Sequence, residues 1–221
     1  MNRSIGVIVM GLGILTLPGA GADEGDAGGG VIASQSVHVQ PSGPRTRPGQ
    51  SRFLDVEGTG IDSPEKYAAF ALVDFPAPKP PAAVEKPTGL TLALTQRVER
   101  YSRDGKVKFY LVADVKEDLQ AFTKTFKFDL ASPDGLAGSI KEKVEVGSGT
   151  FTRKATGQVD RFVLVLDEKA REVLDVQIKA GTIRVLVVPD EPTVAATFLG
   201  AGPNNEAGQR PRLIVGSAPA K

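Results

Sequence analysis

The hydrophobic and polar positions of this sequence alternate with a period of two over several short stretches. The pattern is clearest at Leu90, Leu92 and Leu94, which alternate with threonine and alanine. Because successive side chains of a β-strand point to opposite faces of a sheet, this stretch predicts a strand with one buried face. In the preceding apolar run Phe70 and Leu72 share a face, and the small residues around them predict a strand with close neighbours.

Further stretches with the same alternation predict more strands. The stretch 182–188 is apolar on both faces apart from its first residue and Arg184, which is typical of a strand in the middle of a sheet. The pair Asp104-Gly105 predicts a tight hairpin within 90–111. The other strands are expected at 31–39, 52–57, 106–112, 125–130, 161–166, 194–199 and 212–215, with two weaker, charged outer strands at 141–146 and 149–156.

Helical signals are few by comparison. Asp167 precedes a short run with helical spacing and has the side chain of a helix N-cap. Asp114 and Glu117 have the spacing of a capping box and predict one helical turn between 114 and 122. About ten strands with regularly spaced turns and one short helix predict an all-β fold, a jelly-roll-like antiparallel β-sandwich.

The N-terminal residues have the pattern of an export signal. Arg3 supplies a basic charge, an apolar and glycine-rich run follows at 5–17, and Ala20-Gly21-Ala22 has the small residues that a signal peptidase requires. This run is too short to span a bilayer as a helix, which takes about 20 residues. We expect a secreted or periplasmic protein with a signal peptide at 1–22, a flexible leader at 23–30, the sandwich domain at 31–217 and a tail at 218–221.

Composition and charge argue against several classes of partner. The sequence contains no cysteine, so we expect neither a disulfide nor a lipid-modified cysteine. The formal net charge is +1, and removal of residues 1–22 takes away only the charge of Arg3. A near-neutral chain argues against nucleic-acid binding, whose affinity depends on clustered cations. No later apolar run reaches membrane length, so we expect no membrane insertion. We also expect a monomer.

Four stretches carry strand motifs in a particular order: 51–56 (Ser-Arg-Phe-Leu-Asp-Val), 67–76, 83–94 and 210–215. In this order they resemble the DNRLRE (disaggregatase-related) domains, jelly-roll modules often appended to secreted polysaccharide-degrading enzymes. The second stretch is similar to the family's Tyr-Leu-Arg-Phe-Asp-Leu-Ser, the third to its Ile-x-x-Ala-Thr-Leu-Arg-Leu and the fourth to its ending Pro-x-Leu-x-Val. The resemblance implies a non-catalytic, carbohydrate-binding module.

The single histidine offers little for catalysis. His38 is the only histidine, and no Gly-x-Ser-x-Gly motif is present for a serine that it would activate. Its place on an expected strand predicts a histidine at the surface or rim of the sheet. One histidine without any cysteine also argues against a zinc site.

Carboxylates are a second candidate for chemistry. Asp55 and Glu57 share a strand face about 7 Å apart by strand rise, and Asp74 lies on a neighbouring strand. Two carboxylates on either side of a sugar bond can hydrolyse it. A solvated strand edge, or salt bridges to Arg52 and Lys66, explains these residues equally well. No catalytic residue is therefore assigned.

Exposed aromatic residues would be needed to stack on sugar rings. Tryptophan is absent and only three tyrosines are present. Tyr101 and Arg100 at the end of the expected hairpin, with Tyr110 among lysines on the following strand, can form a small platform for a ligand. Half-buried tyrosines at strand ends are the alternative explanation.

A calcium site is the one cofactor that the sequence leaves open. Glu57, Asp62 and Glu65 lie in one loop and can supply the clustered oxygens that calcium requires. Their spacing matches no known loop motif.

These observations predict an exported, non-catalytic β-sandwich that binds glycan or another component of the cell envelope. A module that pairs with proteins through exposed sheet edges is one alternative, and a carboxylate-dependent glycan-degrading enzyme is another. An open groove lined by Tyr101 and Tyr110 would favour glycan, a long unpaired apolar edge would favour protein partners, and converging carboxylates would favour the enzyme.

Overall fold

The computed structural model describes residues 30–44, 47, 49–59, 68–78, 86–124, 126, 140 and 142–216. In this part of the chain there are twelve strands, two α-helices and one short 3₁₀ helix, η2 (Ala207–Gln209). The helices are α1 (Leu119–Lys124) and α2 (Glu168–Ala180). The strands are β1 (Val31–Ile32), β2 (Gln35–Gln40), β3 (Gly43–Pro44), β4 (Phe53–Glu57), β5 (Phe70–Pro76), β6 (Gly89–Thr95), β7 (Gly105–Val112), β8 (Lys143–Phe151), β9 (Val159–Val165), β10 (Thr182–Pro189), β11 (Ala195–Leu199) and β12 (Arg212–Gly216).

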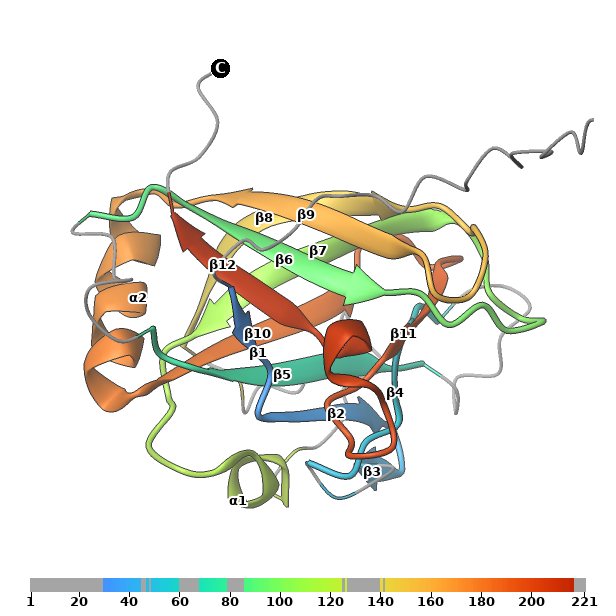
Figure 1. Cartoon of the computed structure of the whole chain (residues 1–221), viewed down its shortest axis with the longest axis horizontal. Coiled ribbons are helices and arrows are strands. Elements are labelled where there is room, and N and C mark those ends of the chain that lie inside the picture. The colour runs from blue at the N-terminus through green and yellow to red at the C-terminus, as the bar shows by residue number, and fades with distance from the viewer. Residues whose placement is uncertain are drawn as a thin grey trace, which may run out of the picture.

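The strands form three antiparallel sheets (Figure 1). Sheet A has the order β1-β12-β6-β9, sheet B the order β3-β2-β5-β10-β7-β8, and β11 pairs with β4 in sheet C. Sheets A and B lie face to face, and isolated bridges connect sheet C to the segments that flank them. The prediction of an all-β antiparallel sandwich is confirmed.

The main hydrophobic core lies between sheets A and B. Leu90, Leu92 and Leu94 of β6 are fully buried in it, as their alternation predicted. The rings of Phe109 in sheet B and Phe162 in sheet A meet across it, with centroids 4.7 Å apart. Because each such side chain contributes roughly 1.5–3 kcal/mol when it leaves water, this interface holds the two sheets together.

The outer face of sheet B carries a second, smaller core. Phe70 and Leu72 of β5 form a buried cluster there with Leu119 and Phe122 of α1. The residues between them on β5 face the main core, so this strand has the close neighbours that the sequence predicted. Strand β10 lies between β5 and β7 in the middle of sheet B, which confirms its predicted position. Sheet B is thus covered on both faces.

Each of the two α-helices in the described part of the chain begins at an aspartate whose side chain accepts a hydrogen bond from a backbone amide. Asp167 accepts from the Ala170 amide at 2.7 Å, so α2 starts where the sequence predicted. The helical turn expected from Asp114 begins further along the chain, at Leu119. The capping side chain there is Asp118, which accepts an amide bond of 2.7 Å in the first turn of α1.

The hairpin expected within 90–111 is not formed. Strand β6 lies in sheet A and β7 in sheet B, so the segment 96–104 crosses from one sheet to the other, with two bridges to β11 on the way. Gly105 provides close packing rather than a turn, because a Cβ at this position would lie 2.7 Å from the Cβ of Val194. A local turn signal was therefore mistaken for a pairing signal.

The remaining predictions concern the outer strands and the segments outside the sandwich. The two outer strands expected at 141–146 and 149–156 are one strand, β8, which does lie at the edge of sheet B. The strand expected at 125–130 lies outside the described residues except for Phe126. The expected signal peptide at 1–22 and tail at 218–221 also lie outside them, as does the leader apart from Gly30.

Candidate functional site

A buried arginine fastens the segment after β7 to the outer face of sheet B. Arg184 of β10 is fully buried, and its Nε and Nη2 atoms each donate to a carboxylate oxygen of Asp74 at 2.8 Å. Its Nη1 atom donates to the carbonyl of Asp114 at 3.0 Å, and Nη2 donates to the carbonyl of Glu117 at 2.9 Å. The bidentate pair is the strong form of ion pairing and holds the guanidinium group in place. The bonds from Arg184 to the two carbonyls then fix this loop where a helical turn had been expected.

The same guanidinium group positions the aromatic ring of α1. The Cζ atom of Arg184 lies 4.5 Å from the ring centroid of Phe122, within the range of a cation–π contact. Phe122 also meets Phe126 edge to face, with centroids 4.9 Å apart. Phe122 is therefore held in place before any ligand arrives.

Helix α2 fixes the other end of the loop. The Nε2 atom of Gln177, a fully buried residue, donates to the carbonyl of Val112 at 2.6 Å and to that of Arg184 at 3.3 Å. The last residue of β7 is thus tied to α2 and to β10 together. A loop restrained at both ends loses little conformational entropy when it binds a ligand.

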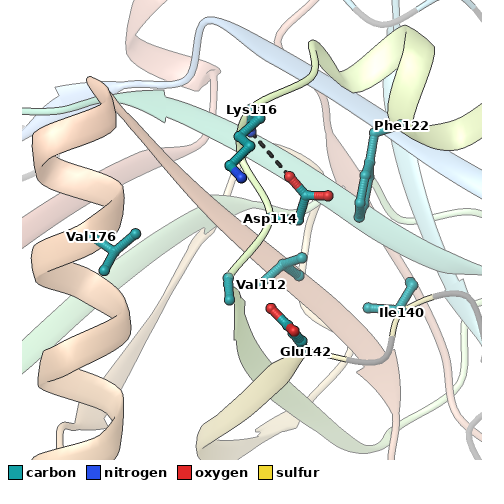
Figure 2. A pocket seen from close by; sticks show the side chains of 8 residues that line it. Val112, Asp114, Lys116, Phe122, Ile140, Glu142 and Val176 are labelled. Atoms are coloured by element: carbon teal, nitrogen blue, oxygen red, sulfur yellow. Dashed lines mark hydrogen bonds between the residues drawn. The ribbon is translucent and has the colours of Figure 1, made fainter.

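A cleft of about 530 Å³ lies beside this loop, between α1 and α2 (Figure 2). Ligand pockets of proteins are typically about 300–1,000 Å³ with a mostly apolar lining and a few polar groups. The side chains labelled in Figure 2 have this mixture: Val112, Phe122, Ile140 and Val176 are apolar, and Asp114, Lys116 and Glu142 are charged.

The charged groups are arranged for hydrogen bonding. Figure 2 shows the carboxylates of Asp114 and Glu142 between Val176 of α2 and the ring of Phe122. Asp114 is oriented because one of its oxygens accepts from the Lys116 amide at 3.1 Å. Two carboxylates that accept and one ammonium that donates, beside an apolar wall, suit a ligand that carries hydroxyl groups on an apolar frame.

Among the predicted ligand-binding residues, Tyr110 lies near this cleft. It stands two residues before Val112 on the same face of β7, which places it about 7 Å along the strand. Tyr110 is half-buried against the second core, and the Nζ atom of Lys143 lies 5.6 Å from its ring centroid. Tyr110 thus borders the cleft without lining it.

Tyr101 and Arg100 lie elsewhere. They precede β7, whereas Tyr110 stands near its far end, roughly 17 Å beyond Gly105 by strand rise. The structure therefore does not bring the two tyrosines together in one platform. Tyr101 is 50% exposed. Partial burial raises the pKa of Tyr101, and the negative charge of Asp55 raises it further.

The predicted carboxylates do not meet. Asp55 and Glu57 share a face of β4 as expected, but Asp74 lies in the ion pair with Arg184 on the outer face of sheet B. Asp55 instead contacts His38, with 3.4 Å between Oδ2 and Nε2. The prediction of a rim position for His38 is wrong, since it is only 5% exposed and its Nδ1 atom lies 3.2 Å from the carbonyl of Phe53 on β4.

Of the three carboxylates predicted to bind calcium, one lies in the described part of the chain. Glu57 lies at the end of β4, while Asp62 and Glu65 lie outside the described residues. Within the described ranges no three metal-binding side chains cluster. Neither of the helices seen there has the length and apolar character needed to cross a membrane.

Comparison with known proteins adds no family to this geometry. A scan against protein-family models finds no match for the sequence, and a search of curated proteins finds none either. The resemblance to DNRLRE domains therefore stays a prediction, and the function has to be argued from the cleft.

The sequence contained one usable signal for this site. Arg184 is a lone charge in an apolar central strand, and Asp74 is a lone charge in another, so a buried pair between them follows if the strands are neighbours. Phe122 and Glu142 had no such signal, because Phe122 lies in α1 and Glu142 directly precedes β8, and only the fold brings these two segments to one cleft.

Proposed function

We propose that this protein is an exported, non-catalytic binding module that holds a segment of glycan in the cleft between α1 and α2. The observation that carries the proposal is the cleft itself: a preformed space with an apolar wall and three charged groups, beside a loop clamped by Arg184. Preformed sites bind without the cost of ordering their own loops.

The chemistry of the cleft matches that of a sugar ring. A pyranose has apolar C–H faces and a rim of hydroxyl groups. Phe122 and Ile140 can cover a C–H face, while Asp114 and Glu142 accept hydrogen bonds from hydroxyls and Lys116 donates one. Hydrogen bonds to charged groups are stronger than those between neutral groups, which favours such a ligand over a purely apolar one.

A role without catalysis is supported by how the candidate carboxylates are used. Both oxygens of Asp74 are bound by Arg184, and one oxygen of Asp55 contacts His38, so neither carboxylate faces the other across a site for a sugar bond. The export part of the proposal rests on the pattern of residues 1–22, and fractionation of cells that express the whole chain tests it directly.

A glycan array with the purified protein tests the binding role. We expect Glu142→Gln to weaken binding of any glycan that the array detects by about tenfold, which corresponds to about 1.4 kcal/mol. Glu206→Gln, an exposed glutamate on the loop before β12, is the matched control and should bind as the unchanged protein does. Equal affinity of the two variants, or no binding to any glycan by the unchanged protein, contradicts the proposal.

A further inference from the structure

One edge of sheet A is formed by a long and regular strand. In the described part of the chain, β9 lies at the end of sheet A and pairs with β6 alone (Figure 1). Its 7 residues keep one register with β6, without a bulge. An edge of this kind presents a row of backbone amides and carbonyls and is a template for a further strand.

The other described edges of the two large sheets are protected in ways that proteins use against such pairing. Sheet A ends on its other side at β1, which has 2 residues, and sheet B ends at β3, which also has 2 and includes Pro44. The remaining edge, β8, has a register shift in its pairing with β7 and carries Lys143 and Glu145. Strand β9 has no proline and no bulge, so it is the edge most open to a partner.

The hydrogen bonds with β6 determine which backbone groups of β9 face this edge. The amide of Leu166, directly after β9, donates to the carbonyl of Thr88 at 3.0 Å. Hydrogen-bonded pairs alternate along an antiparallel ladder, so the even-numbered residues of β9 bond to β6. The amides and carbonyls of Val163 and Val165 therefore point away from β6, toward the edge.

The outward side chains of β9 are mostly apolar. Val159, Val163 and Val165 are 39%, 47% and 55% exposed. Phe162, which alternates with them, is buried in the main core, where Gly149 of β8 lies against its ring. Strand β8 therefore packs against the inner face of β9 and not beside its edge. A strand added at this edge would cover exposed valines as well as pair with the backbone.

We propose that this protein forms a symmetric dimer in which β9 pairs antiparallel with β9 of a second copy, so that the two copies of sheet A become one continuous sheet. A dimer axis through Leu164 places Val163 of each copy opposite Val165 of the other. The two apolar pairs then form where the amides and carbonyls of both strands face each other. The proposal departs from the monomer expected from the sequence and does not rest on the function proposed for the cleft.

The charges near the end of the strand favour this register and a second copy as the partner. Asp167 follows β9 with an extended backbone, and an axis through Leu164 places it opposite Arg161 of the other copy. Arg161 also has an interaction within its own chain, so its charge serves here to select the register. An axis through Arg161 would place two arginines opposite each other, and like charges in such positions are destabilising. An edge that complements itself in this way suits an isologous interface.

Sedimentation velocity of the purified protein at concentrations from about 1 μM to about 1 mM tests for this dimer. We expect a dimer at the upper end of this range. The double change Val163→Lys with Val165→Lys should raise the dissociation constant by about tenfold or more, because lysines of both copies then meet at one edge. Thr150→Lys, at an exposed position on the edge strand β8 of sheet B, is the matched control and should leave the constant unchanged.

A mixture of two variants separates a loss of pairing at this edge from a loss of folding. The double change Val163→Glu with Val165→Glu should also prevent the dimer, but mixing it with the lysine variant should restore one, because each lysine then faces a glutamate. Amide hydrogen exchange at Val163 and Val165 of the unchanged protein should slow as its concentration rises.

Three results would overturn the proposal. A monomer over the whole concentration range overturns it in favour of a different protein as the partner of this edge. A dimer that the lysine variant leaves intact overturns it in favour of another interface. A mixture of the folded lysine and glutamate variants that stays monomeric overturns the pairing of Val163 with Val165.

Discussion

At the scale of single residues, two buried charges determine where the candidate cleft forms. Arg184 and Asp74 stand on neighbouring strands of sheet B and form their ion pair among apolar residues. Burial of a charge is costly, and the pair offsets that cost through its two hydrogen bonds and through the carbonyls that Arg184 also binds. The sequence shows both charges but not the register that brings them together.

Removal of one member of this pair should be strongly destabilising. We expect Arg184→Leu to lower the free energy of unfolding by about 3–5 kcal/mol, because it leaves Asp74 buried without a partner. The double change Arg184→Leu with Asp74→Leu should recover most of the loss, since no charge then remains buried. Urea unfolding measures both, and a single-variant cost below about 1 kcal/mol would contradict the role assigned to the pair.

The phenol of Tyr101 should lose its proton at a higher pH than that of an ordinary tyrosine. Burial and the nearby charge of Asp55 raise its pKa above the ordinary value of 10.0. A raised pKa means that the folded state holds the phenol proton more firmly than the unfolded state. The resulting stability is complete below pH 10.0 and is lost as the pH rises through the pKa of the folded state.

Ultraviolet absorbance titration isolates this group. The difference between the unchanged protein and Tyr101→Phe should show a midpoint above 10.0. Asp55→Asn should lower that midpoint, because it removes the second largest cause of the shift. A midpoint at or below the ordinary value would disprove the prediction.

At the scale of elements, alternation predicted strands well and their partners poorly. The alternating leucines of β6 and the cap of α2 are local properties, and both were found where the sequence placed them. The partner of β7 is not local: it pairs with β10 and β8, each more than thirty residues away along the chain. His38 was misplaced for the same reason, because β4 covers it and no pattern around the histidine reports that contact.

A substitution at Gly105 tests whether the glycine of the Asp104-Gly105 pair is needed for close packing, as the structure indicates, rather than for a tight turn. Since a Cβ there would lie 2.7 Å from Val194, Gly105→Ala should overpack the site and cost about 1–3 kcal/mol. Gly208→Ala is the matched control: no atom lies within 4 Å of its added Cβ, and we expect a change within about 0.5 kcal/mol. Urea unfolding compares them, and equal stability of the two variants would argue against close packing at Gly105.

At the scale of the whole molecule, the sandwich places the cleft on one side of its main core. The cleft lined by Glu142 lies on the outer face of sheet B, and sheet A lies beyond the core. Changes at positions that share no partner residues act additively. Val163→Thr, at a position on sheet A that is 47% exposed, should therefore leave binding in the cleft unchanged, and a double variant with Glu142→Gln should bind as Glu142→Gln alone does. A glycan array with the three variants measures this, and a further loss of binding in the double variant would argue against the separation.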